Sequence, residues 1–275
     1  MVGVFAIKEF ISIDGQQIEG RLPLRSLFYG EGVFETFRWK TTPPAFWDRH
    51  LLRMRNGAEV LGIPFPGVGD MERAVERAVL DSQIPDAYVK ICLLSQGASA
   101  FYENPRGASI LVVIRQYEPP KAFIKARTSP FRRSSSSPIL KLKSLNYLEN
   151  IFARREAMAQ GFDEAVFLNE KGEITEGSAS NIFWLKDGVL FTPSLECGLL
   201  PGVIRGVVID IAKGVGIRVE EGHFDLDNLT SSQCTFFTNS LVGAVPVPWI
   251  DEFEIPSDSQ DFERIKAVLL ERLVW

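Results

Sequence analysis

Two lysines near the middle of the chain could do covalent chemistry. Lys141 and Lys143 alternate in the run KLKSLN, a pattern typical of a short strand that leads into a helix. An amine enclosed at such a junction has a lowered pKa and becomes a Schiff-base nucleophile. Alternation along a strand would point both amines the same way, so spacing does not choose between them. Either could equally be an ordinary surface lysine.

Other common reactive sites have no support in the sequence. The chain has only two histidines, His50 and His223, and neither stands with cysteines or carboxylates at zinc-ligand spacing, so we expect no metal site. GxSxG, GxxxxGK[ST] and GxGxxG motifs are absent. Cys92, Cys197 and Cys234 form no CxxC pair, which indicates reduced thiols with a packing role. The reactive group of an enzyme with this sequence would therefore be a lysine or a cofactor.

Composition and charge argue against two classes of partner. The 275 residues are 45% hydrophobic and carry a net charge of −5, which disfavours nucleic-acid binding. The densest basic stretches, Lys121–Lys125 and Arg132–Arg133, are short and are typical of solvated loops. The sequence has no apolar run of about 18 residues and no signal-peptide pattern at its N-terminus. We therefore expect a cytoplasmic protein that binds neither nucleic acid nor membrane.

Hydrophobic periodicity predicts the elements that position the reactive groups. The first residues read as strands around a turn at Asp14–Gly15. A helix capped by Asp48 runs to about Gly62, with Leu51, Met54, Ala58 and Leu61 on its apolar stripe. A second, amphipathic helix covers 70–82, and buried strands cover 88–94 and 109–115.

The second half of the chain follows a change in composition. Four prolines and a four-serine run between Tyr117 and Pro138 indicate a domain connection and a loop. A strand-to-helix segment then ends at Gly161, and strands with polar turns follow. A helix from Val203 to Lys213 comes after the loop SLECGLLPG, and CTFFTNSLVGAVPVPWI reads as strand, polar loop and strand.

Five motifs in order make the chain similar to a known family. YGEGVFETFR, HLLRM, the block from KSLNYLEN to NIFWL, LLPGVIRG and TNSLVGAVPV resemble class-IV pyridoxal-phosphate enzymes over roughly residues 25–250. The family includes branched-chain and D-amino-acid aminotransferases and 4-amino-4-deoxychorismate lyase. In this family the lysine before Ser-Leu-Asn carries pyridoxal 5′-phosphate (PLP), so the resemblance selects Lys143 as the catalytic residue.

The resemblance also implies a fold. It predicts an α/β (α+β) protein of fold-type IV, with two α/β domains and the cofactor between them. The expected boundaries are a smaller domain over 1–118, a connection and loop over 119–138, and a larger cofactor-binding domain over 139–275. Members of the family are usually homodimers, so a second copy is the expected partner beside a small amino substrate.

Further cofactor-binding residues follow from the resemblance. Glu176 would face the pyridine nitrogen and keep it protonated, and Arg53 would bind the phosphate as a cationic fork. His50, one helical turn before Arg53, would support that region or simply pack. Tyr147 would lie near the phenolic oxygen of the cofactor. The main chain of Val203 and Ile204 would seat the phosphate at a helix N-terminus, together with Asn239 and Ser240. Four residues are weaker candidates for the substrate pocket: Phe34, Arg38, Gln96 and Arg106.

Two reactions of the family fit the sequence. KSLNYLEN, SLECGLLPG and TNSLVGAVPV favour the lyase, which releases pyruvate and 4-aminobenzoate in the folate pathway. The stretch SQGASAFY, where a bacterial lyase carries an arginine, lacks one, although Arg106 follows it. KSLN also occurs in D-amino-acid aminotransferases, so an aminotransferase of D-amino-acid or branched-chain type is the alternative. A non-catalytic binding protein on the same fold would require an idle Lys143.

Overall fold

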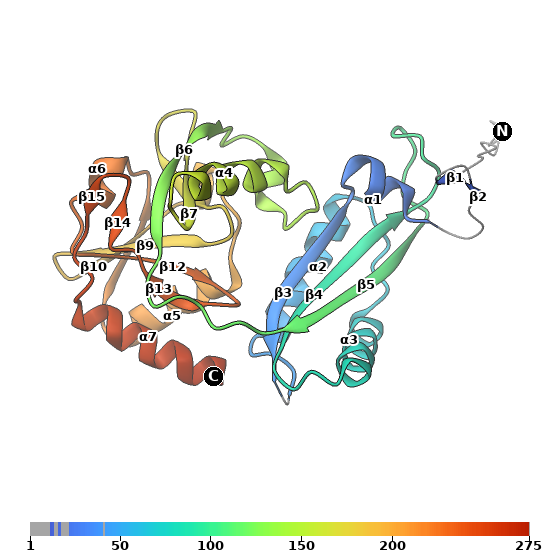
Figure 1. The fold of residues 1–275 in the computed structure, drawn as a ribbon, viewed down its shortest axis with the longest axis horizontal. Helices are drawn as coiled ribbons and strands as arrows, with labels where there is room; N and C mark the ends of the chain where they lie inside the picture. The colour runs from blue at the N-terminus through green and yellow to red at the C-terminus, as the bar shows by residue number, and fades with distance from the viewer. Residues whose placement is uncertain (1–11, 14–15, 18–21, 41, 275) are drawn as a thin grey trace.

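The computed structural model describes residues 12–13, 16–17, 22–40 and 42–274, which form two lobes (Figure 1). The N-terminal lobe (residues 22–116) holds a three-stranded sheet, and the C-terminal lobe (residues 125–274) holds two five-stranded sheets. This mixture of helices and sheets confirms the predicted α/β class. The strand prediction around Asp14–Gly15 lies mostly outside the described residues, of which only the antiparallel pair β1 (Ser12–Ile13) and β2 (Gln16–Gln17) remains.

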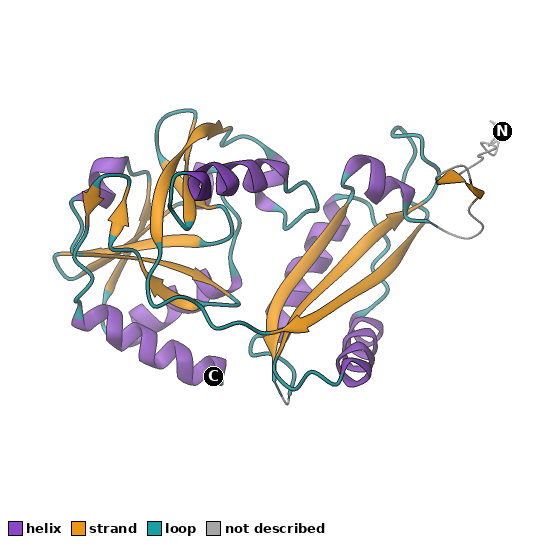
Figure 2. Cartoon of the chain, in the orientation of Figure 1, coloured by secondary structure: helices purple, strands orange, loops and turns teal. Residues whose placement is uncertain are grey.

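The N-terminal lobe is an antiparallel sheet with two helices on one face (Figure 2). A short helix at its start, α1, precedes the first strand. The bounds of its elements are α1 (Leu24–Tyr29), β3 (Gly32–Trp39), α2 (Trp47–Val60), α3 (Val68–Ser82), β4 (Ala87–Gln96) and β5 (Gly107–Gln116). Val33 and Phe37 of β3 pack in one core with Leu51 of α2 and Met71 of α3. Strand alternation leaves Phe34 and Thr36 on the opposite face.

The predicted helices of this lobe are confirmed, with small shifts at their ends. Asp48 lies in the first turn of α2, and the N-cap is Phe46, whose φ is 64°. Strand β4 is buried as predicted. Strand β5 is an edge strand whose apolar face packs only partly buried against the core that contains α3, while its other face is exposed. The prediction of a buried strand at 109–115 is therefore wrong in its burial.

The C-terminal lobe packs two sheets face to face. The first has the order β11-β10-β9-β12-β13 and the second β15-β14-β6-β7-β8. Their bounds are β6 (Lys125–Arg133), β7 (Glu164–Asn169), β8 (Ile174–Gly177), β9 (Asn181–Lys186), β10 (Val189–Pro193), β11 (Arg218–Gly222), β12 (Cys234–Asn239), β13 (Gly243–Pro246), β14 (Trp249–Ile250) and β15 (Phe253–Glu254). Val166 and Leu168 of β7 meet Ile182 and Trp184 of β9 in the core between the sheets.

Helices cover the outer faces of both sheets. Phe183 of β9 packs against α5 (Val203–Gly214) and α7 (Gln260–Leu273), while Phe167 of β7 packs against α4 (Leu148–Ala159). Strands β7 and β9 are therefore buried on both faces, which explains their continuous apolar sequences. The remaining elements are η1 (Pro138–Lys141), η2 (Leu195–Cys197) and α6 (Leu226–Thr230).

One segment differs from the sequence-based prediction, and another contains a strand. Within the segment 119–138, residues 125–133 form β6, which pairs in parallel with β7. The short strand predicted around Lys141 and Lys143 is wrong, because residues 138–141 form the 3-10 helix η1 and only Ser144 bridges to β3. The helix prediction for 203–213 and the strand–loop–strand prediction for 234–250 are confirmed. Within the described ranges, none of the helices has the length and apolar character required to cross a membrane.

Candidate active site

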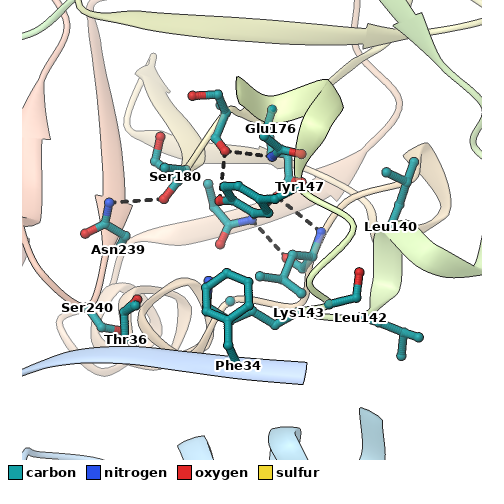
Figure 3. Close-up of a pocket in the computed structure, with 18 of the residues that line it drawn as sticks. Phe34, Thr36, Leu140, Leu142, Lys143, Tyr147, Glu176, Ser180, Asn239 and Ser240 are labelled. Carbon is teal, nitrogen blue, oxygen red and sulfur yellow. Dashed lines mark hydrogen bonds between the residues drawn. The ribbon is translucent and has the colours of Figure 1, made fainter. Parts of the chain in front are cut away.

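A cavity of about 450 Å³ lies where the two lobes meet, and Lys143 reaches into it (Figure 3). Strand β3 fixes the position of this lysine: Phe34 N–H donates to the carbonyl of Lys143 at 2.8 Å, and Leu145 N–H donates to the carbonyl of Gly32 at 2.9 Å. Lys141 is exposed and does not line the cavity. Tertiary structure thus separates two lysines that their spacing left equivalent.

The environment of Lys143 favours the neutral amine. Burial of the amine, followed by the positive charge of Arg53, lowers the pKa of Lys143 from 10.5 to about 8. Its Nζ lies 4.6 Å from the centre of the Phe34 ring. A substantial fraction of the amine is therefore unprotonated near neutral pH, as a nucleophile or a general base requires.

Glu176 is buried on the same cavity and is held by three donors. Arg133 Nη1 donates to its Oε1 at 2.8 Å, while Leu200 N–H and Asn181 Nδ2 approach its Oε2 at 3.2 and 3.3 Å. Burial raises the pKa of Glu176 from 4.5 to about 7, although Arg133 opposes this rise. The carboxylate can therefore hold a proton or hydrogen-bond a protonated ring nitrogen close to neutral pH.

Arg133 corrects an interpretation made from the sequence. The pair Arg132–Arg133 was expected in a solvated loop, yet Arg133 is only 2% exposed. Its guanidinium lies 3.5 Å from the centre of the Phe167 ring and also binds Glu149 through Nε at 3.0 Å. The residue ends β6 and points into the lobe, because Glu176 on β8 offers a buried charge partner.

Arg53 is oriented by a buried carboxylate that sequence reasoning missed. Glu35 accepts two hydrogen bonds from Arg53 Nε and Nη2, both at 2.7 Å, and lies 2.7 Å from His50 Nδ1. Burial alone would raise the pKa of Glu35, but Arg53 and His50 outweigh it and lower the pKa to about 2. Arg53 Nη1 also donates to the carbonyl of Pro201 at 3.1 Å. The planar fork of Arg53 is therefore fixed beside the cavity.

The sequence does contain a sign of this cluster. In strand GVFETFRW, Glu35 alternates with Val33 and Phe37 on the apolar face, where a carboxylate needs a cationic partner. His50 and Arg53, one turn apart on the facing helix, are that partner. His50 is buried and contacts Glu35, the same carboxylate that orients Arg53.

Backbone amides form one end of the cavity, at the start of α5. Val203 and Ile204 line the cavity and open α5, whose N-cap residue, Gly202, has no side chain to bond their amides. A side chain at Gly202 would place Cβ 1.9 Å from Asn181 Oδ1, so only glycine fits there. Within the described chain, the buried Thr238 Oγ1 has no hydrogen-bond partner. Free amides beside an unpartnered hydroxyl form a natural seat for an anion.

Ser240 and Asn239 lie at this same end, with different roles. Ser240 Oγ is 3.4 Å from His50 Nε2 and lines the cavity. Asn239 also lines it, but its side chain fixes the turn: Oδ1 accepts from Leu241 N–H and Val242 N–H, both at 2.9 Å. Its Nδ2 donates to the carbonyl of Ala179 at 3.1 Å. The hydroxyl of Ser240 is therefore the group that can reach an anion.

Tyr147 and Phe34 form the wall beside Lys143. Their rings meet edge to face at 5.5 Å between centres. The Tyr147 hydroxyl donates to the carbonyl of Ser178 at 3.0 Å, and burial raises the pKa of this phenol. Tyr147 is therefore neutral at physiological pH and offers the cavity a hydroxyl oxygen.

Three of the weaker candidates lie outside the cavity. Arg38 binds Asp86 in two hydrogen bonds of 2.8 and 2.7 Å. Gln96 bonds Ser109 on the neighbouring strand, and Arg106 pairs with Glu103 at 2.5 Å. Of the four substrate-pocket candidates, only Phe34 lines the cavity. Lys90 and Thr36, which the sequence did not single out, also line it.

Known proteins resemble this chain over most of its length. A family model for class-IV amino-transferases matches residues 32–250. The aminodeoxychorismate lyase of Bacillus subtilis (strain 168) is 30% identical over 264 residues, which cover 90% of this chain and 89% of that protein. The branched-chain-amino-acid aminotransferase of Escherichia coli (strain K12) is 27% identical over 245 residues, which cover 84% and 79%.

Solved structures agree with these matches. A Legionella pneumophila protein provisionally named 4-amino-4-deoxychorismate lyase superposes with a TM-score of 0.86 at 29% identity, over 90% of this chain and 93% of that one. A branched-chain aminotransferase from the thermophilic archaeon Thermoproteus uzoniensis, solved with norvaline, superposes with a TM-score of 0.82 at 28% identity, over 95% and 93%. The fold-type IV prediction is confirmed. Because the family model spans well over half of its length, this chain belongs to the class-IV aminotransferase family of enzymes.

Proposed function

We propose that the cavity binds PLP through Lys143 and that the enzyme is a 4-amino-4-deoxychorismate lyase. The observation that carries the cofactor assignment is that the amine of Lys143 reaches into a cavity that the buried carboxyl group of Glu176 also lines. Burial lowers the pKa of this amine, which agrees with the assignment. The reaction is supported by the 30% sequence identity to the aminodeoxychorismate lyase of Bacillus subtilis, which extends over 90% of this chain.

The residues present fit the cofactor at three points. Lys143 supplies the amine that attaches the aldehyde carbon. The amides of Val203 and Ile204, with the unpartnered Thr238 Oγ1, supply a seat for the phosphate, next to the fixed guanidinium of Arg53. Glu176 supplies the carboxylate for the pyridine nitrogen.

When bound, PLP supplies an electron-withdrawing ring that stabilises negative charge on the substrate carbon bearing the amine. The amine of Lys143 would be the base that removes the proton from that carbon. Glu176 would hydrogen-bond a protonated ring nitrogen, and Arg133 opposes the rise in the pKa of Glu176 that burial causes. The Phe34 ring, which is in edge-to-face contact with Tyr147, lies against the Lys143 amine and would limit its motion.

The position of Lys90 favours a substrate that carries a negative charge. Its Nζ lines the cavity 4.1 Å from the centre of the Phe34 ring, and among the described residues it forms no ion pair with a carboxylate. A carboxylate of the substrate can therefore bind there. Aminodeoxychorismate carries two carboxylates, either of which could pair with Lys90. Loss of its enolpyruvyl group makes the six-membered ring aromatic, which favours the elimination.

A second candidate function is transamination of an amino acid with a 2-oxo acid, of branched-chain or D-amino-acid type. The 27% identity to the aminotransferase of Escherichia coli supports it. One assay separates the two reactions. The lyase forms 4-aminobenzoate and pyruvate from aminodeoxychorismate with no oxo acid present. Activity that requires an amino donor and an oxo-acid acceptor, with no aminobenzoate formed, would reject the lyase and support the alternative.

We further propose that the enzyme is a cytoplasmic homodimer. Leu27 and Phe28 of α1 are 63% and 60% exposed, and Phe101 and Tyr102 are each 74% exposed. Tyr29 bonds the carbonyl of Ser99, so these apolar side chains form one surface. Light scattering should give twice the mass of the chain, and a charged residue in place of Phe28 should give the monomer mass.

A further inference from the structure

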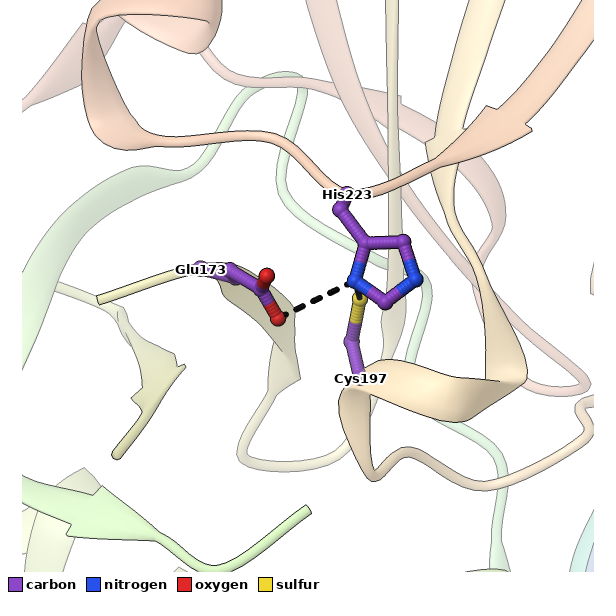
Figure 4. A group of neighbouring side chains, drawn as sticks. All are labelled: Glu173, Cys197 and His223. Carbon is purple, nitrogen blue, oxygen red and sulfur yellow. Dashed lines mark hydrogen bonds and ion pairs between the residues drawn. The ribbon is translucent and has the colours of Figure 1, made fainter. Parts of the chain in front are cut away.

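A second cluster of reactive side chains lies in the C-terminal lobe, apart from the cavity (Figure 4). Glu173 precedes β8, Cys197 ends η2, and His223 follows β11. His223 Nδ1 lies 3.1 Å from Glu173 Oε2 and 3.6 Å from Cys197 Sγ, and the three donor atoms all lie within 4.8 Å of one another. The three residues are distant in sequence, which is why no ligand spacing revealed them.

We propose that Glu173, Cys197 and His223 bind one Zn²⁺ ion. A tetrahedral zinc ion with ordinary bond lengths separates a sulfur and a nitrogen ligand by about 3.6 Å, and a nitrogen and an oxygen ligand by about 3.4 Å. The corresponding distances here are 3.6 and 3.1 Å, so binding needs only small side-chain shifts. Thiolate, imidazole and carboxylate are also the ligand types that zinc prefers.

Neighbouring groups already orient two of the three ligands. Glu196 Oε2 lies 3.3 Å from His223 Nε2, so the far ring nitrogen can donate to a carboxylate while Nδ1 faces the metal. Asn169 Nδ2 donates to Glu173 Oε2 at 2.7 Å and holds that carboxylate. Such outer partners fix the tautomer and the direction of metal ligands.

Zinc binding releases one ligand proton and leaves the fourth coordination position of the metal open. Zinc replaces the thiol proton of Cys197, which leaves to solvent. His223 must present Nδ1 without a proton, so its remaining ring proton lies on Nε2 against Glu196. The side chain of His223 is 42% exposed, so a water molecule can complete the tetrahedron. Cys197 is fully buried and closes the inner side of the site.

Metal binding would stiffen two segments that reach the cavity. Glu173 stands three residues before Glu176 on the segment that forms β8. Cys197 stands three residues before Leu200, whose N–H donates to Glu176 at 3.2 Å. The proposed ion therefore ties both segments together without touching the reacting atoms, and the inference does not depend on the proposed cofactor or reaction.

Cobalt titration of the full chain, after dialysis against a chelator, tests the site. We expect one Co²⁺ per chain, with a thiolate-to-metal charge-transfer band and visible bands of tetrahedral intensity, and displacement of Co²⁺ by Zn²⁺. Cys197→Ser should abolish the charge-transfer band. His223→Gln and Glu173→Gln should each weaken binding about tenfold or more. Cys234→Ala, which removes another fully buried thiol, should leave the band intact.

Cys197 is buried, so its serine variant could fold poorly. His223 is partly exposed, so His223→Gln should fold and still tests the site. A charge-transfer band that survives in Cys197→Ser, binding that is unchanged in His223→Gln, or the absence of any band in the parent protein would each overturn the proposal. At the same zinc concentration, the melting temperature should rise less in His223→Gln than in the parent protein and in Cys234→Ala.

Discussion

The carbonyl of Lys143 accepts a 2.8 Å hydrogen bond from the N–H of Phe34, and the amine of the same lysine lies 4.6 Å from the centre of the Phe34 ring. Lys143 belongs to the C-terminal lobe and Phe34 to the N-terminal sheet. The position of the reactive amine is therefore set by contact between the lobes as well as by the segment that carries it. Any change that separates β3 from this segment should also move the amine.

Removal of the amine should abolish cofactor attachment and turnover. We expect Lys143→Ala to lose the visible absorbance of lysine-bound PLP and to lower kcat by about 10²–10⁴-fold or more, since it removes both the attachment point and the base. Borohydride reduction followed by peptide mapping should label position 143 in the parent protein. Lys141→Ala is the matched control and should retain both properties. A label found on Lys141 instead would refute the assignment.

The rate of cofactor attachment should depend on pH in a defined direction. Only the neutral amine attacks an aldehyde, and burial lowers the pKa of Lys143 to about 8. The rate at which PLP attaches to the cofactor-free protein should therefore rise with pH and level off above about 8. Stopped-flow absorbance across the pH range measures it. A profile that still rises toward 10.5, the ordinary value for lysine, would contradict the proposed environment.

Neutralising Glu176 should separate cofactor binding from catalysis. Glu176→Gln should keep PLP attached to Lys143 but lower kcat by about 10²-fold or more, because an amide does not keep the ring nitrogen protonated. Absorbance and steady-state kinetics measure the two effects. Glu149→Gln is the control, since Glu149 also pairs with Arg133 but its side chain is 41% exposed. Equal losses of activity in both variants would point to Arg133 rather than Glu176.

The Glu35 cluster should matter for stability and for phosphate affinity. Glu35→Gln leaves Arg53 and His50 without their buried anion, which should cost about 3–5 kcal/mol of unfolding free energy. It should also raise the Kd for PLP, because Arg53 loses its fixed orientation. Urea unfolding and cofactor titration measure the two effects. Asp86→Asn, which breaks the more exposed pair with Arg38, should cost about 1 kcal/mol or less.

Acid should weaken the same cluster over a defined range. The pKa of Glu35 is lowered from 4.5 to about 2 in the folded protein. Its contribution to stability is therefore complete above pH 4.5 and is lost as the pH falls toward 2. The parent protein should lose more unfolding free energy than Glu35→Gln over this range. Parallel losses in the two proteins would show that other carboxylates dominate.

Lys90 should set the affinity for an anionic substrate. Lys90→Met should raise KM about 10–100-fold with little change in kcat, the loss expected for one hydrogen bond to a charged group. Steady-state kinetics with aminodeoxychorismate measure the effect. Lys125→Met is a control outside the cavity. A large fall in kcat with an unchanged KM would assign Lys90 a role in the reaction itself.

Local sequence pattern was sufficient to predict most helices and strands and some of the residues that line the cavity. Helical spacing predicted α2 and α3, because each of these helices buries one stripe against a sheet. It failed at residues 138–144, where the 3-10 helix η1 and a single bridge from Ser144 to β3 take the place of the expected strand. It also failed for Arg133, because a doublet of arginines in a polar stretch does not reveal which one finds a buried carboxylate.

The sequence by itself determined the family resemblance, the α/β class and the identity of the groups that can react, since these depend on residue types and short spacings. Only the tertiary structure decided which groups meet. It separated Lys143 from Lys141, buried Glu35 between Arg53 and His50, and brought Cys197 to His223. Burial and charge pairing depend on residues far apart in the chain, and only the folded backbone brings such residues within contact distance.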